Sequence, residues 1–95
     1  MDLVFRGEII HWRGPAPFHF VTVPEEQSAA IEAVSSMVTY GWGAIPVQAR
    51  IGATEFKTSL FPRGELYVVP VKDAVRRSEG VELGDTVTVH LNLDV

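Results

Sequence analysis

The sequence predicts a mainly β protein, a small closed barrel of about six or seven strands with two short helices. Three observations lead to this fold class. Apolar and polar residues alternate over several short segments, glycine and proline separate these segments at close spacing, and only two segments have helical periodicity. With 95 residues, 46% of them hydrophobic, the chain suits one domain, residues 1–95, with a single core.

The chain opens with a predicted hairpin. Residues 2–12 are apolar on much of both sides and predict a long strand, in which Gly7 marks a bend or a bulge. Residues 13–17, RGPAP, form a stiff turn, and residues 18–23 return as an antiparallel strand. Trp12 is thereby placed at the rim of the hairpin, where we expect it to pack rather than to bind a ligand.

A helix is predicted next, from Pro24 to about Val38. Proline suits the first helical position, and the acidic side chains of Glu25 and Glu26 complement the helix dipole. Two glycines within residues 40–43 then interrupt regular structure, and this segment is expected to form a loop at the barrel rim.

A second hairpin is predicted from the alternating segments 47–51 and 56–60, with residues 52–54 as its turn. Matching like faces places Arg50 opposite Lys57. The full set of expected pairs is Ile51 with Phe56, Arg50 with Lys57, Ala49 with Thr58, Gln48 with Ser59 and Val47 with Leu60. A sheet tolerates two opposed cations if they diverge into solvent, if Glu55 or Glu65 lies diagonally between them, or if an anion binds there.

The last third begins with a predicted turn at residues 62–64 and a short buried strand at residues 67–69. Pro70 is expected to end this strand because it lacks a backbone donor.

Helical periodicity starts at Val71, and Gly80 is expected to stop that helix at its C-terminus. The pair Gly84-Asp85 supplies a turn into the clearest half-buried strand of the chain, residues 86–93, in which valine and leucine alternate with polar residues.

The pattern of residues 66–91 resembles the half-barrel unit of AbrB/MazE-type swapped-hairpin domains. The whole chain is more similar still to an uncharacterised bacterial and archaeal family, the domain of unknown function nineteen-oh-five. The residues that carry this likeness are Val23-Pro24, residues 42–47, residues 58–62, Tyr67, residues 69–71, residues 75–77 and Gly84-Asp85. The resemblance implies a double-split β-barrel and no established activity.

Composition narrows the class of protein. Without cysteine the chain has no disulfides and no thiolate chemistry, which fits a cytoplasmic location. No apolar run approaches the roughly 20 residues that span a bilayer, and Asp2 and Glu8 distinguish the N-terminus from a signal peptide. A net charge of −4 argues against a nucleic-acid partner, because phosphate neutralisation supplies most non-specific affinity.

Catalytic and cofactor motifs are missing from the sequence. The three histidines, His11, His19 and His90, do not have metal-ligand spacing, so neither a metal nor another cofactor is expected. Ser59 lies in no nucleophile motif and has no evident base. We therefore expect a non-catalytic protein.

One group of residues suggests a ligand site. Arg50, Lys57 and Arg76 are cationic, and Trp42 and Tyr67 offer flat apolar walls, a combination that suits a carboxylate or phosphate. We expect these five residues to rim one opening of the barrel. The alternative is that Arg76 and Arg77 form the solvated face of the second helix, with Asp73 pairing one of them.

Three functions follow from these observations, in order of preference. The first is non-catalytic binding of a small anionic ligand or a protein partner by a monomer or homodimer away from membranes. The second is a purely structural interaction module. The third, DNA binding, is implied by the AbrB resemblance and opposed by the acidic charge.

Overall fold

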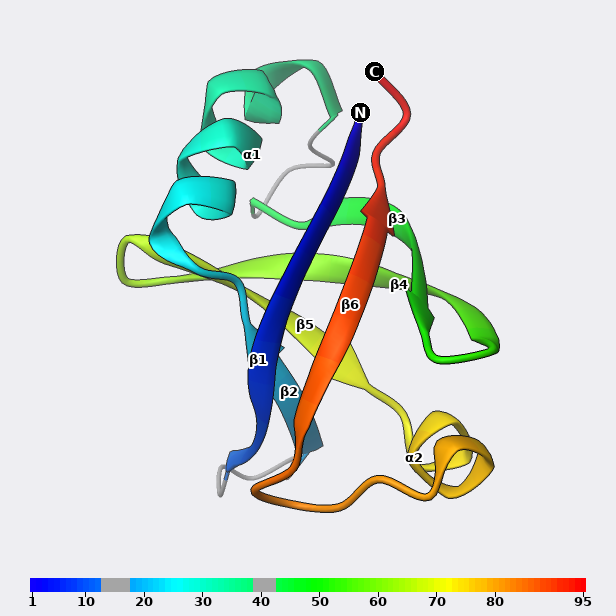
Figure 1. Ribbon diagram of the computed structural model, residues 1–95. Coiled ribbons are helices and arrows are strands. Elements are labelled where there is room, and N and C mark those ends of the chain that lie inside the picture. Colours follow the sequence, from blue (N-terminus) through cyan, green and yellow to red (C-terminus); the bar gives the residue numbers. More distant parts are fainter. Residues whose placement is uncertain (13–17, 39–42) are drawn as a thin grey trace.

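The computed structural model describes residues 1–12, 18–38 and 43–95, and its six strands form a closed antiparallel barrel with two helices outside it (Figure 1). The strands are β1 (Asp2–Trp12), β2 (Phe18–Thr22), β3 (Ile45–Ile51), β4 (Thr54–Arg63), β5 (Leu66–Val71) and β6 (Thr86–Asn92), and the helices are α1 (Glu25–Val38) and α2 (Asp73–Glu79). Around the barrel the order is β1-β2-β5-β4-β3-β6. The prediction of a mainly β closed barrel with two helices is confirmed.

Side-chain alternation fills the barrel interior. Along β3 and β6 every second residue is buried, and the residues between them face outward. The interior of these two strands comprises Ile45, Val47, Ala49, Ile51, Val87, Val89 and Leu91. The outward residues of the same strands are therefore available for a surface site.

Strand β1 closes the barrel by pairing with two different neighbours. Residues Asp2 to Glu8 pair with β6, and Ile9 to Trp12 pair with β2. Gly7 lies just before this change of partner, and the ladder with β6 continues through it, so there is no bulge. A Cβ atom on Gly7 would lie 2.5 Å from Cγ1 of Val21, which shows that the glycine makes room for β2.

The predicted register of the second hairpin is wrong by two residues. Arg50 lies opposite Glu55 rather than Lys57, and Lys57 lies opposite Gln48. The turn contains only Gly52 and Ala53, because Gly52 adopts a φ of 58° and allows a two-residue loop. A shift of two residues keeps every side chain on its predicted face but replaces a pair of like charges by a pair of opposite ones.

Three predicted boundaries in the last third are also wrong. Strand β5 continues through Pro70 to Val71, and α2 begins only at Asp73. Pairing of β5 with β4 ends at Val68, so at Pro70 the strand has only β2 beside it and the missing donor is tolerated. Strand β4 likewise extends to Arg63, and the turn that follows is Gly64-Glu65.

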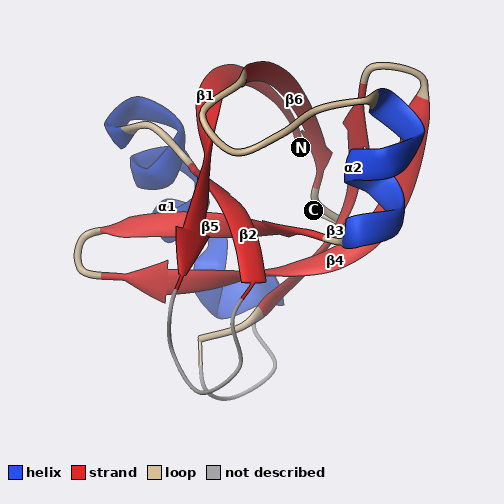
Figure 2. Cartoon of the chain, turned by 90° about the horizontal axis from the view of Figure 1, so that it is seen from below, coloured by secondary structure: helices blue, strands red, loops and turns tan. Residues whose placement is uncertain are grey.

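The two helices lie at opposite ends of the barrel (Figure 1). Near the start of α1, the fully buried Ser28 donates a hydrogen bond to the Val23 carbonyl at 2.9 Å and accepts one from the Tyr67 amide at 3.2 Å. Helix α2 lies beside the β3–β4 hairpin (Figure 2), and Gly80 caps it in the left-handed conformation as predicted. In the part of the chain that is described, neither helix has the length and apolarity needed to cross a membrane.

The predicted turn at residues 13–17 and residues 40–42 of the predicted rim loop, 40–43, lie outside the described residues. Trp12, at the described end of β1, is 41% exposed, and the guanidinium of Arg63 lies over its ring at 4.9 Å.

Candidate functional site

The outer face of β1, β6, β3 and β4 carries two rows of mostly polar side chains. They point outward because the residues between them fill the core. The first row is Val4, His90, Arg50 and Glu55, and the second is Asp2, Asn92, Gln48 and Lys57. Four strands thus bring together residues that are up to about ninety positions apart in the sequence.

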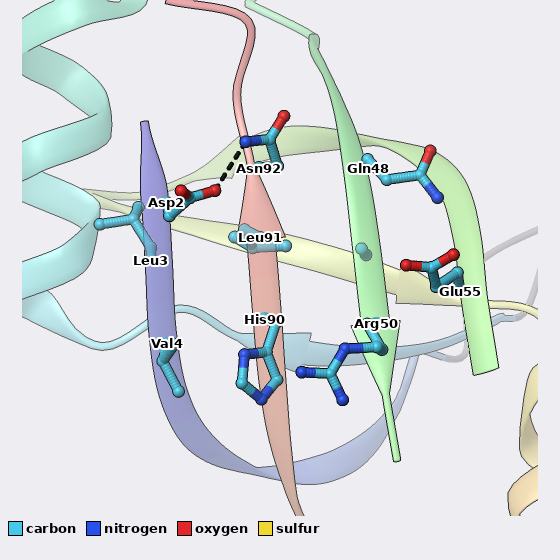
Figure 3. Close-up of a pocket in the computed structure, with 10 residues that line it drawn as sticks. Asp2, Leu3, Val4, Gln48, Arg50, Glu55, His90, Leu91 and Asn92 are labelled. Carbon is cyan, nitrogen blue, oxygen red and sulfur yellow. Dashed lines mark hydrogen bonds between the residues drawn. The ribbon is translucent and has the colours of Figure 1, made fainter. Parts of the chain in front are cut away.

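A hollow with a volume of about 210 Å³ lies between these rows (Figure 3). All of the first row and most of the second line it, and so do Leu3, Ala49 and Leu91, which alternate with them along the strands. Lys57 lines a neighbouring hollow, which shares Gln48 and Asn92 with the first. The first hollow is smaller than typical drug-sized ligand sites, so it fits a ligand of a few non-hydrogen atoms.

Arg50 is the cationic group of this hollow. Its Nη1 donates a hydrogen bond to the Gly52 carbonyl at 2.8 Å, which holds the side chain against the hairpin turn. No carboxylate of the described residues lies within 4.0 Å of the guanidinium, although Glu55 occupies the opposite strand position. Figure 3 shows the guanidinium next to the His90 ring, so several N–H donors face the hollow.

Amide and carboxylate groups line the other end of the hollow. The side-chain amide of Asn92 donates a hydrogen bond to Asp2 at 2.6 Å, and Gln48 lies beside Asn92 on the next strand (Figure 3). The hollow therefore offers a fixed positive charge at Arg50 and hydrogen-bonding groups of both kinds at Asp2, Asn92 and Gln48. This arrangement suits a small molecule with one anionic group and one or more hydroxyl or amino groups.

The residues predicted to share one rim are separated in the structure. Arg50, Lys57, Tyr67 and Arg76 line four different hollows, and Trp42 lies outside the described residues. The four described members therefore do not share one rim. Arg50 and Lys57 lie on the same outer face but line neighbouring hollows. Tyr67 is buried against α1, and Arg76 lies on α2 at the opposite end of the barrel.

Tyr67 has a structural role, because it is buried and connects β5 to α1. Its side chain is only 5% exposed, and its hydroxyl donates a hydrogen bond to Glu32 Oε2 at 2.6 Å, which joins β5 to α1. Burial, together with the hydrogen bond and the negative charge of Glu32, raises the pKa of Tyr67 to about 12. The tyrosine is therefore a neutral anchor for α1 at physiological pH.

This anchor predicts a change of stability in alkaline solution. Because the folded-state pKa lies above the ordinary value of 10, the stabilising effect of the neutral hydroxyl is present below pH 10 and is lost as the pH rises to about 12. Unfolding by denaturant across this range should show a smaller loss of stability for Tyr67→Phe than for the parent. In Glu32→Gln, the absorbance titration of tyrosinate should show a lower Tyr67 pKa; an unchanged value would contradict the assigned cause.

Arg76 matches the alternative interpretation of the basic pair in its partner, Asp73, but not in its exposure, because its side chain is only 21% exposed. Its Nη2 forms an ion pair with Asp73 at 2.6 Å on the same helix, and this pair lowers the pKa of Asp73. Arg77 is exposed, with no carboxylate of the described residues within 4.0 Å.

Five polar residues of the candidate site were not predicted as ligand contacts: Asp2, Gln48, Glu55, His90 and Asn92. The sequence did indicate that His90 and Asn92 face outward, since they alternate with buried valine and leucine. Their convergence with Arg50 depends on the ladder between β3 and β6, which joins two segments about forty residues apart. Local periodicity contains no information on that pairing.

The chain matches the model of a known protein family. The family model described as Domain of unknown function (DUF1905) matches residues 5–91, nearly the whole chain. No curated protein matches the chain.

Proposed function

Because the chain belongs to the DUF1905 family, whose description names no activity, we propose from its geometry that it binds a small organic anion without catalysis, in the hollow beside Arg50. The ligand class is a short carboxylate that also carries hydroxyl or amino groups. The observation that supports this proposal is the guanidinium of Arg50, which lies next to His90 at a hollow lined by four strands and has no carboxylate of the described residues within 4.0 Å.

Charge and size define the expected ligand. Arginine binds carboxylates through parallel hydrogen bonds, and one of its terminal nitrogens is already held by the Gly52 carbonyl, so the remaining donors are oriented in advance. The carboxylates of Asp2 and Glu55 line the same hollow and disfavour a ligand with several negative charges. A monocarboxylate with donor groups at its other end satisfies both conditions.

Calorimetric titration with short hydroxy acids and amino acids tests the proposal. Arg50→Ala should weaken binding of the best member of this panel about tenfold or more, the expected effect of removing hydrogen bonds to a charged group. Arg6→Ala is the matched control, since Arg6 is an exposed residue of the same barrel face, makes the same change of net charge and does not line the hollow. Equal losses in both variants, or no binding by any panel member, would refute the proposal.

A protein partner is the second candidate, and a different face favours it. Ile10, Trp12 and Phe61 are exposed large apolar residues on the outer side of the β1-β2-β5-β4 half of the barrel. Arg63 lies over the rings of Trp12 and Phe20, at 4.9 and 5.1 Å, so the face combines aromatic and arginine side chains, as binding hot spots often do. Sedimentation at increasing concentration, with Phe61→Glu for comparison, tests self-association through this face.

A further inference from the structure

Two histidines face each other at the end of the barrel nearer α2. His11 on β1 pairs directly with His19 on β2, and their ring centroids are 4.9 Å apart at an interplanar angle of 47°. Because side chains alternate along a strand, the two histidines are on the same inward face as Ile9 and Val21. The histidines lie at the end of the barrel, however, and are partly exposed there. Neither residue lines the hollow beside Arg50.

Helix α2 adds a third basic side chain to this pair. His19 is the ladder partner of Val71, and α2 begins two residues after Val71, so the chain path brings Arg76 near His19. The nearby charge of Arg76 contributes, after burial, to a lowered pKa of His19, and His11 acts in the same direction. Asp73 is the one acidic group that opposes these effects.

The hydrogen bonds of Arg76 are incomplete. Its Nη2 is paired with Asp73, but its Nε is buried and has no hydrogen-bond partner among the described residues. A buried donor without an acceptor is costly, which indicates that an acceptor is missing from this cluster. Two imidazole rings and a guanidinium from three elements therefore converge with more donors than acceptors.

We propose that His11, His19 and Arg76 form a binding site for a phosphate group, either inorganic phosphate or a phosphomonoester. The tetrahedral oxygens would accept hydrogen bonds from the two imidazoles and from the guanidinium, with a small shift of Arg76 to present its unpaired donor. This site is separate from the one proposed above and does not depend on it.

The charge of Arg76 decides between an anion and a metal ion. Two facing imidazoles are potential metal ligands, but a guanidinium beside them repels a divalent cation and attracts an anion. A bound phosphate also neutralises the mutual repulsion of Arg76, His11 and His19, so it favours protonated rings. Binding is therefore expected to strengthen as the pH falls through the histidine pKa values.

Imidazole chemical shifts measured by NMR over a pH titration, with and without inorganic phosphate, provide the test on the unmodified protein. Saturating phosphate should raise the pKa of His11 and His19, by about one pH unit for His19, the magnitude typical of a nearby opposite charge. His90 lies beside Arg50 on another face of the barrel, so a response confined to His11 and His19 distinguishes this site from the hollow proposed above. A parallel titration with glycerol phosphate distinguishes the two ligand classes. Tighter binding of glycerol phosphate would indicate a phosphomonoester, and tighter binding of inorganic phosphate would indicate the free ion.

Variants on α2 separate a specific site from general attraction. Arg76→Gln should abolish the phosphate-dependent rise, whereas Arg77→Gln, the same change at the exposed neighbouring position, should leave it intact. Asp73→Asn should tighten phosphate binding, since it releases the Arg76 nitrogen that the carboxylate now occupies. Unchanged histidine pKa values at saturating phosphate, equal effects of the two arginine variants, or a response of His11 and His19 to Ni²⁺ but not to phosphate would overturn the proposal.

Discussion

Gly7→Ala is expected to lower the free energy of unfolding by about 1–3 kcal/mol, the usual cost of forcing an extra group into a packed interior. The added Cβ would lie 2.5 Å from Cγ1 of Val21 and 3.3 Å from the carbonyl oxygen of Thr22. Val21 is fully buried and cannot move away without disturbing its neighbours. Chemical denaturation of the two proteins measures the difference.

A double-mutant cycle identifies the cause of this loss. Gly7 does not adopt a positive φ, so alanine introduces no backbone strain and only the contact with β2 is at issue. Val21→Ala removes the clashing methyl group, and the Gly7→Ala change should therefore cost less in the Val21→Ala background than in the parent. Strictly additive effects would show that crowding against Val21 is not the reason for the glycine.

Ser28→Ala is expected to cost a similar amount, about 1–3 kcal/mol, because it leaves two buried backbone groups without a partner. The hydroxyl accepts the Tyr67 amide hydrogen and donates to the Val23 carbonyl, while the Val23 amide donates to the Tyr67 carbonyl at 2.8 Å. A side chain of α1 thus continues the hydrogen bonding between β2 and β5 beyond the end of β2. The loss should appear as a lower denaturation midpoint.

The control for this variant lies on the same helix. Ser36→Ala makes the identical chemical change at an exposed position and should alter stability by less than about 0.5 kcal/mol. Amide hydrogen exchange at Tyr67 gives a second measurement, since its amide loses its acceptor in Ser28→Ala alone. Equal stability of the two serine variants would contradict the bridging role of Ser28.

Local patterns predicted the elements well because the interior of a small barrel imposes strict alternation. Strand β1 has the predicted bounds, Asp2–Trp12, and Gly80 ends α2 as expected. The predicted end of β5 and the predicted register of the second hairpin are wrong, because contacts outside the local segment determine them. Pro70 remains in β5 because β4 has already separated from it, and the second hairpin turns within two residues because Gly52 permits it. Neither condition is visible in a short window of sequence.

Only part of the candidate site was predictable, because the site also depends on pairing between strands that are distant in the sequence. Arg50 was selected from its chemistry, and it does line a hollow with other polar groups. The same chemistry predicts Lys57, Tyr67 and Arg76, but residue type does not specify where a side chain lies on the barrel. Lys57 lines the neighbouring hollow, Tyr67 is buried, and Arg76 lies on α2. Asp2 and Asn92, which share a hydrogen bond, are ninety residues apart and could be brought together only by the pairing of β1 with β6.

The ladder between β1 and β6 also affects how the chain reaches its folded state. It joins the first strand to the last, with seven paired positions from Asp2–Asn92 to Glu8–Thr86. Contacts across so long a stretch of sequence slow folding, because the entropy of closing the loop is lost before the contact is gained. During synthesis, β1 therefore has to wait for residues 86–92 to leave the ribosome, and its apolar residues are exposed to chaperones and to other nascent chains until then.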